Sequence, residues 1–118
     1  MIKPPKNTDK YQWTHHVFGK MLYYGISENR IQRIIRFPKR VEEGIAPETI
    51  AVMQPAGTKK YQEIWAMYKL AKRANSKSQI PNSKQEKIKI ITAWRYPGKS
   101  PERDPVPKEI IEEVRRLL

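Results

Sequence analysis

The chain has 118 residues, enough for one domain of ordinary size and too few for two. It has no cysteine, which excludes a disulfide framework and a thiolate zinc site, and no apolar run long enough to cross a membrane. The formal net charge is +12, and residues 59–99 alone carry eleven Lys and Arg against two acids. This excess predicts attraction to a polyanion, namely RNA, DNA or an acidic protein segment. The N-terminus has no signal-peptide pattern, so we expect a cytoplasmic protein without a membrane partner.

The N-terminal residues predict a tail and a first helix. Residues 1–10 hold two prolines, three lysines and no apolar pattern, which is typical of a flexible basic tail. Apolar residues then recur at helical spacing over 14–24, with Thr14 as the capping residue and Gly25 where a left-handed C-terminal residue is expected. Gly19 inside this helix costs about 1 kcal/mol relative to alanine, and close packing against a sheet would explain it.

A second helix is predicted from Glu28 to about Phe37. Ser27 supplies its N-cap, and Pro38 ends it. Isoleucines form its apolar stripe, and three arginines form a separate stripe: Arg30, Arg33 and Arg36. Guanidinium groups on an exposed helix side favour contact with phosphate.

Strands follow the two helices. Short strands are expected at 39–44 and 48–54. The segment 61–72 fits both helical spacing and strand alternation, and its aromatic density together with the need of 87–96 for a neighbour favours a strand. Residues 73–86 are rich in Ser, Asn, Lys and Gln and predict a long polar hairpin loop that can close over a ligand.

The segment 87–96 predicts a central strand that ends at the Pro97-Gly98 turn. Strict alternation gives it one side that faces the core, which carries Ile88, Ile90, Thr92, Trp94 and Tyr96. The other side holds the cations, and it carries Lys87, Lys89, Ile91, Ala93 and Arg95. Such a strand predicts either a floor for an anionic ligand or an ordinary central strand whose lysines reach into water.

The last residues, 101–118, predict a proline-rich linker and an amphipathic helix that begins near Pro107. The apolar side of this helix carries Ile110, Ile111, Val114, Leu117 and Leu118. It either docks on its own sheet or binds another chain. The predicted fold is therefore α+β, with two N-terminal helices packed on a three- to four-stranded antiparallel sheet within 11–100, plus this C-terminal helix.

Few patterns in the sequence carry catalytic chemistry. It has no phosphate-binding glycine loop, no serine-hydrolase elbow and no tight carboxylate pair. His15 and His16 would point about 100° apart on a helix and cannot share one metal ion, so we expect neither a metal nor a cofactor. His16 is the candidate general acid or base, and Arg95 is the candidate catalytic cation that holds a phosphate beside it.

Cations and aromatic residues are the candidates for binding nucleic acid. The candidate nucleic-acid-binding residues are Lys20, Arg30, Arg33, Tyr96 and Lys99. Exposed aromatic rings can stack on unpaired bases, and the further candidates for that role are Tyr23, Tyr61 and Trp65. Trp94 is expected in the core.

Two stretches of the chain resemble a known family. Residues 16–27, His-Val-Phe-Gly-Lys-Met-Leu-Tyr-Tyr-Gly-Ile-Ser, are similar to the first-helix signature of a family of small, mostly uncharacterised prokaryotic proteins. Residues 90–99, Ile-Ile-Thr-Ala-Trp-Arg-Tyr-Pro-Gly-Lys, are similar to the closing strand of that family. The family has the RelE/BrnT-like fold of microbial ribonuclease toxins. His16 matches the histidine of the signature, whereas Lys20 and Tyr24 stand where the family usually has arginines.

The resemblance covers about residues 11–100 and implies a metal-independent endoribonuclease of toxin–antitoxin type, with an acidic antitoxin-like protein as its partner. In such a reaction a base takes the proton of the ribose 2′-hydroxyl, and cations stabilise the charged phosphorane. This reaction requires His16 and Arg95 to border one open pocket. The alternative is a non-catalytic module that binds nucleic acid or a protein partner.

Overall fold

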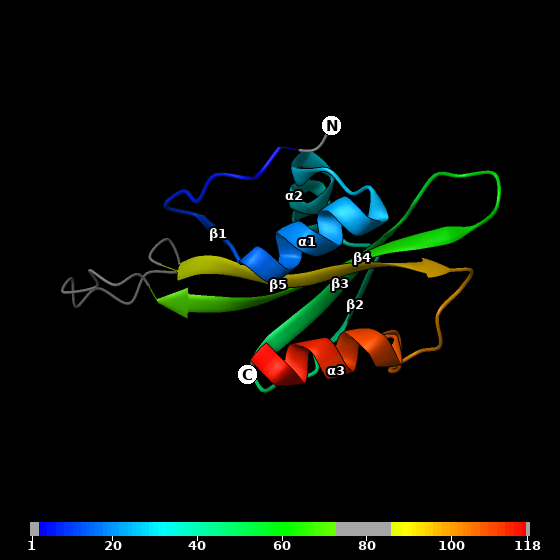
Figure 1. Ribbon diagram of the computed structural model, residues 1–118. Coiled ribbons are helices and arrows are strands. Elements are labelled where there is room, and N and C mark those ends of the chain that lie inside the picture. The colour runs from blue at the N-terminus through cyan, green and yellow to red at the C-terminus, as the bar shows by residue number, and fades with distance from the viewer. Residues whose placement is uncertain (1–2, 73–85, 118) are drawn as a thin grey trace.

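The computed structural model describes residues 3–72 and 86–117. The elements within these ranges are β1 (Tyr11–Trp13), α1 (His15–Tyr24), α2 (Glu28–Arg36), β2 (Arg40–Glu43), β3 (Thr49–Pro55), β4 (Gln62–Lys72), β5 (Glu86–Pro97) and α3 (Lys108–Leu117). The strands form one sheet with helices on both of its faces (Figure 1). The fold is therefore α+β, as expected.

The sheet is mixed, with the strand order β1-β5-β4-β3-β2. β1 runs parallel to β5, whereas the other neighbouring strands are antiparallel. The expectation of three or four antiparallel strands is therefore wrong, because the sheet has five strands and one parallel pair. β1 has three residues, too few for alternation to show in the sequence. Asn7, from the predicted tail, accepts a hydrogen bond from the Trp13 N–H at 2.7 Å and so attaches that segment to β1.

The sheet separates two hydrophobic cores. On one face α1, α2 and β1 contribute a core that includes Trp13, Met21, Ile31, Ile34, Val52, Ile64 and Ile90. On the other face α3 covers a core that includes Met53, Trp65, Met67, Trp94, Ile110 and Val114 (Figure 1). The C-terminal helix therefore docks on its own sheet, and Trp94 lies in the core as predicted.

A β-bulge in β5 breaks the alternation that the sequence predicts. Met67 of β4 pairs with Thr92, but the next residue, Tyr68, pairs with Ile90, so Ile91 is extra. An extra residue reverses which face the following side chains point to. Sequence alternation alone could not reveal this, because the register depends on the partner strand.

The bulge places the two halves of β5 on different faces from those expected. Ile88 and Ile90 pack under α1 and α2, whereas Trp94 and Tyr96 pack under α3. Lys89 lies between Ile88 and Ile90 and so points to the α3 face, whereas Arg95 points to the α1 face, where it contacts α1. The single cationic side predicted for this strand is therefore wrong.

Local signals predicted the helices and the ambiguous strand well. Thr14 caps α1 by accepting from the Val17 N–H, and Gly25 ends it with a φ of 67°. Ser27 caps α2 in the same way. The segment 61–72 is a strand, whereas the loop predicted at 73–86 falls almost wholly outside the described residues. Within the described ranges, no helix has the length and apolar character needed to cross a bilayer.

Candidate anion-binding site

His16 and Lys20 lie on α1 where it faces α3, beyond the end of β1. Lys20 Nζ contacts Glu113 Oε1 of α3 at 2.7 Å. His16 Nε2 lies 3.1 Å from Thr92 Oγ1 and 3.5 Å from Glu113 Oε2. Around these groups is an open groove of about 480 Å³, hereafter the α1–α3 groove, lined by His15, His16, Gly19, Lys20 and Tyr23 of α1 and by Glu113, Arg116 and Leu117 of α3.

The environment of His16 favours the neutral ring. Burial lowers the pKa of His16 below its ordinary value of 6.5, the Glu113 carboxylate opposes this shift, and the Lys20 ammonium adds to it. A ring that is neutral at physiological pH can accept a proton as a general base. It lacks the second ring proton that an imidazolium would donate as a general acid.

Arg95 lies at the opposite end of α1. Its Nε and Nη2 donate to the Tyr24 carbonyl at 3.3 and 3.2 Å, and its Nη1 lies 3.4 Å from Gln62 Oε1. Tyr24 is eight residues from His16, which is about 12 Å along a helix axis. Arg95 does not line the α1–α3 groove. The expected pocket shared by His16 and Arg95 is therefore not formed.

Arg30, from the first turn of α2, lies at the same end of the sheet as Arg95, since its partner Pro55 pairs with Glu63, the neighbour of Gln62. Its Nη2 donates to the Pro55 carbonyl at the end of β3, and its Nε is buried without a hydrogen-bond partner among the described residues. Burial lowers the pKa of the Arg30 guanidinium, and the positive charges of Arg33 and Arg95 lower it further. Arginine nevertheless stays protonated in proteins, so two positive charges lie at this end of the sheet. We call this place the Arg30–Arg95 site.

Within the described ranges, no carboxylate pairs with the Arg30–Arg95 site. Among the described residues, neither guanidinium has a carboxylate oxygen within 4.0 Å. Their partners are backbone carbonyls and the amide oxygen of Gln62. Each guanidinium carries five N–H donors, and these contacts use at most three of those of Arg95 and one of those of Arg30. Both residues are partly exposed, so the site is open to solvent in part.

Further cations surround this end of the sheet. The α1–α2 turn, the β3–β4 connection and the end of β5 lie together there (Figure 1). Lys59 and Lys60 belong to the β3–β4 connection, and Lys99 follows Gly98, whose N–H donates to the Tyr61 carbonyl at 3.1 Å. These lysines and Arg33 are exposed. The predicted nucleic-acid-binding residues Arg30 and Lys99 and the candidate catalytic cation Arg95 therefore lie at this end, and Arg33 is exposed on α2, whereas Lys20 lies in the α1–α3 groove.

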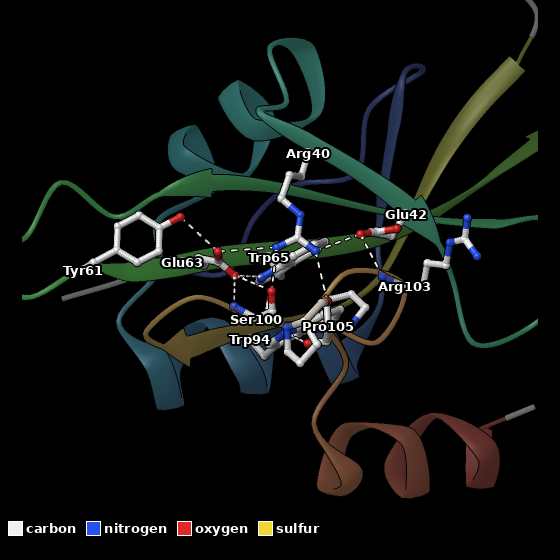
Figure 2. Close-up of polar contacts among 10 residues, drawn as sticks. Arg40, Glu42, Tyr61, Glu63, Trp65, Trp94, Ser100, Arg103 and Pro105 are labelled. Carbon is white, nitrogen blue, oxygen red and sulfur yellow. Dashed lines mark hydrogen bonds and ion pairs between the residues drawn. The ribbon is translucent and has the colours of Figure 1, made fainter.

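A third arginine, Arg40 of β2, has a different environment on the α3 face (Figure 2). Its guanidinium stacks 5.0 Å from the Trp65 ring, contacts Glu42 at 2.8 Å and lies 3.5 Å from Glu63 Oε2. It also donates to Ser100 Oγ at 2.8 Å and to the Pro101 carbonyl at 3.2 Å. Two carboxylates thus neutralise Arg40, and we call this group the Arg40 cluster.

Glu63 is the centre of the Arg40 cluster and is 0% exposed. The Tyr61 hydroxyl donates to it at 2.9 Å, the Trp65 Nε1–H at 3.0 Å, and Ser100 donates both its N–H, at 3.2 Å, and its hydroxyl (Figure 2). Burial acts to raise the pKa of Glu63, but these hydrogen bonds outweigh burial, so the pKa lies below its ordinary value. The saturated carboxylate attaches the linker before α3 to β4.

The aromatic candidates divide according to burial. Trp65 is fully buried and cannot stack on a base, and Tyr96 packs partly buried against the core under α3. Tyr61 is held through its hydroxyl by Glu63. Tyr23 is 78% exposed and borders the α1–α3 groove, which leaves it as the best placed of the predicted stacking residues.

Other parts of the surface suit a polyanion less well. A recess of about 680 Å³ beside β2 is lined by Glu42 and Glu43 together with Arg103, so its net charge is negative. Within residues 3–72 and 86–117, no group of three or more His, Asp or Glu side chains is arranged to hold a metal ion.

Sequence reasoning missed the acids that organise these sites. Glu113 joins the α1–α3 groove from a helix that lies outside the family resemblance. Glu63 is one of two acids in the basic segment 59–99 and stands between Tyr61 and Trp65. An isolated acid in an aromatic, basic strand is a signal that could have indicated a buried ion pair.

Comparisons with protein-family models, with curated proteins and with solved structures found no match for this chain.

Proposed function

We propose that the protein binds RNA and that the Arg30–Arg95 site holds a backbone phosphate. The observation that carries this proposal is that Arg30 and Arg95 both bind backbone carbonyls at the end of the sheet where β3 and β4 meet, without a carboxylate within 4.0 Å in the described residues. Bringing two like charges together without a counter-charge destabilises the free protein, and an anion between them relieves that repulsion. Guanidinium donors match phosphate oxygens in geometry as well as in charge.

The charge of the whole chain supports a polyanion rather than a small anion. The net charge is +12, and Lys59, Lys60 and Lys99 extend the cationic surface from the Arg30–Arg95 site. A row of cations fits a chain of phosphates, whose binding releases counterions. RNA is abundant in the cytoplasm, where we expect this protein to act.

We propose that the protein binds RNA without cleaving it. A cleavage site of the expected type needs His16 beside Arg95, and these two residues lie at opposite ends of α1. His16 is further engaged by Thr92 and lies beside Glu113, whose carboxylate is paired with Lys20. We therefore expect RNA to stay intact in the presence of the protein, with or without a metal chelator.

The test is the affinity for a fluorescent single-stranded oligoribonucleotide, measured by anisotropy at two salt concentrations. Arg95→Gln and Arg30→Gln should each weaken binding by about tenfold to a hundredfold, because each removes charge-assisted hydrogen bonds of about 1.5–3 kcal/mol. Arg115→Gln on the exposed side of α3 removes the same charge and is the control. Added salt should weaken wild-type binding more than binding by either site variant, since fewer phosphate contacts release fewer counterions.

An equal loss in Arg115→Gln and in the two site variants would contradict the proposal, because it would reduce binding to net charge alone. A DNA oligonucleotide of the same sequence separates the two nucleic acids. Equal affinity for RNA and DNA would leave the phosphate site in place but would remove RNA as its specific ligand.

A further inference from the structure

A glycine in the middle of α1, Gly19, is among the residues that line the α1–α3 groove. A glycine inside a helix weakens it, so such a residue usually has a packing reason. Gly19 has none in this structure: it is exposed, and a Cβ built on it would meet no atom within 4 Å. The expectation that Gly19 allows α1 to approach the sheet is therefore wrong. Because Gly19 has no side chain, the groove stays open at this position.

One wall of the groove is a tyrosine ring that is exposed yet held in place. Tyr23 is 78% exposed, and it lies one helical turn from Gly19 on the same side of α1. Its ring contacts Tyr24 edge to face, with centroids 4.8 Å apart and planes at 88°, and Lys20 Nζ lies 5.5 Å from its centroid. An aromatic ring fixed by its neighbours and open to solvent is a preformed stacking platform.

The opposite wall, from α3, adds the Glu113 carboxylate, which is paired with Lys20, together with one apolar and one positive group. Leu117 is largely exposed at the groove, and Arg116 stands beside it. Arg116 has no carboxylate within 4.0 Å among the described residues, whereas the charge of Lys20 is offset by Glu113. A groove that combines an exposed aromatic ring, an apolar side chain and, within the described ranges, a cation without a carboxylate partner fits a base and its phosphate better than it fits an apolar peptide.

We propose that the α1–α3 groove binds one unpaired nucleobase, which stacks on Tyr23 above Gly19 while its phosphate contacts Arg116. This inference rests on the proposed RNA binding and adds to it a second site, along the side of α1 that faces α3. The groove volume of about 480 Å³ is within the range of small-ligand sites. The Arg30–Arg95 site holds backbone phosphate of any nucleotide, and the groove requires a base that is free of pairing.

The sharpest test fills the groove without harming the fold. Gly19→Leu places a side chain in open space and improves helix propensity, so its melting temperature should equal or exceed that of the wild type. Its affinity for a single-stranded oligoribonucleotide should nevertheless fall about fivefold or more, as should that of Tyr23→Ala. Tyr23→Phe keeps the ring and should bind as the wild type does. Leu22→Ala, on the same helix but outside the groove, is the matched control.

Inorganic polyphosphate separates this inference from the proposed function, because it has phosphates but no bases. Tyr23→Ala and Gly19→Leu should bind polyphosphate as the wild type does, whereas Arg30→Gln and Arg95→Gln should lose affinity for it. Unchanged RNA affinity in Gly19→Leu and Tyr23→Ala, with a loss in the arginine variants, would overturn the base site alone. Equal losses for RNA and polyphosphate in the groove variants would also overturn it. Failure of the wild type to bind RNA would overturn both proposals.

Discussion

The arginines on the two faces of the sheet are held in opposite ways. On the α3 face, Arg40 stacks on Trp65 and contacts the carboxylates of Glu42 and Glu63. On the α1 face, Arg30 and Arg95 lie together and have backbone carbonyls and an amide as their partners among the described residues. The same residue type, arginine, is therefore paired with carboxylates on one face of the sheet. On the other face it has no carboxylate partner among the described residues.

This difference is the reason to expect a structural role for the Arg40 cluster and to propose phosphate binding at the Arg30–Arg95 site. A buried charge that has its counter-charge and its hydrogen bonds needs no ligand, and breaking it destabilises the protein. Two cations that lack a counter-charge are a cost to the free protein, and a bound anion removes that cost. Substitutions in the Arg40 cluster should therefore lower the free energy of unfolding, whereas the Arg30–Arg95 site should bind added anions.

The largest effect is expected at the centre of the Arg40 cluster. Glu63→Ala leaves Arg40 without its buried partner and leaves the Trp65 Nε1–H and the Ser100 N–H without an acceptor. We expect the free energy of unfolding to fall by about 3–5 kcal/mol in urea denaturation, as for other broken buried ion pairs. Glu43→Ala, an exposed acid on β2, is the control and should change it little. A Glu63→Ala variant as stable as the control would show that the cluster contributes no stability.

Acid should weaken the protein through the same cluster. Hydrogen bonds outweigh burial and lower the pKa of Glu63, and hydrogen bonds from Arg40 and Arg103 lower the pKa of Glu42. Both groups therefore bind protons less readily in the folded than in the unfolded chain, so their contribution to stability is present above the ordinary value of 4.5 and is lost as the pH falls through the lowered folded values. Urea midpoints measured between neutral pH and about pH 3 check this. A Glu63→Gln variant should show a flatter profile, and an identical pH slope in both proteins would contradict it.

Anions should produce a smaller effect, at the Arg30–Arg95 site. Inorganic phosphate that binds the folded state raises the melting temperature by mass action, and we expect a rise of a few degrees at concentrations well above its dissociation constant. Phosphate also stabilises proteins in general by exclusion from their surface, so the variant Arg30→Gln, measured under the same conditions, is the necessary reference. Equal rises in wild type and Arg30→Gln would show that the stabilisation is general and that the site binds no phosphate.

The fold and the sites could be predicted from the sequence where the signals are local. Thr14, Gly25 and Ser27 bound their helices through contacts within a few residues, so their roles were correctly predicted. β1 and the bulge at Ile91 depend on pairing with a distant strand, which no local pattern records. The incorrect prediction of a single cationic side for β5 followed from this limit.

The candidate site shows the same division. Arg30 and Arg95 could be named from residue type and spacing, but their placement at one end of the sheet could not be predicted, because α2 and β5 are far apart in sequence. The expected pairing of Arg95 with His16 failed because Arg95 contacts the C-terminal end of α1 at Tyr24, whereas His16 lies at its N-terminal end. Glu113 remained hidden because it comes from α3, whose docking position the sequence left open.

The most direct test of the Arg30–Arg95 site is an NMR titration that follows the arginine Nε–Hε signals of the intact protein while unlabelled single-stranded RNA is added. Signals of Arg30 and Arg95 should shift as RNA binds, because phosphate oxygens approach their guanidinium groups. The Arg40 signal should stay in place, since its carboxylate partners already occupy it. RNA binding that leaves Arg30 and Arg95 unshifted, or that shifts Arg40 as much as the pair, would contradict the assignment of this site as the one that holds phosphate.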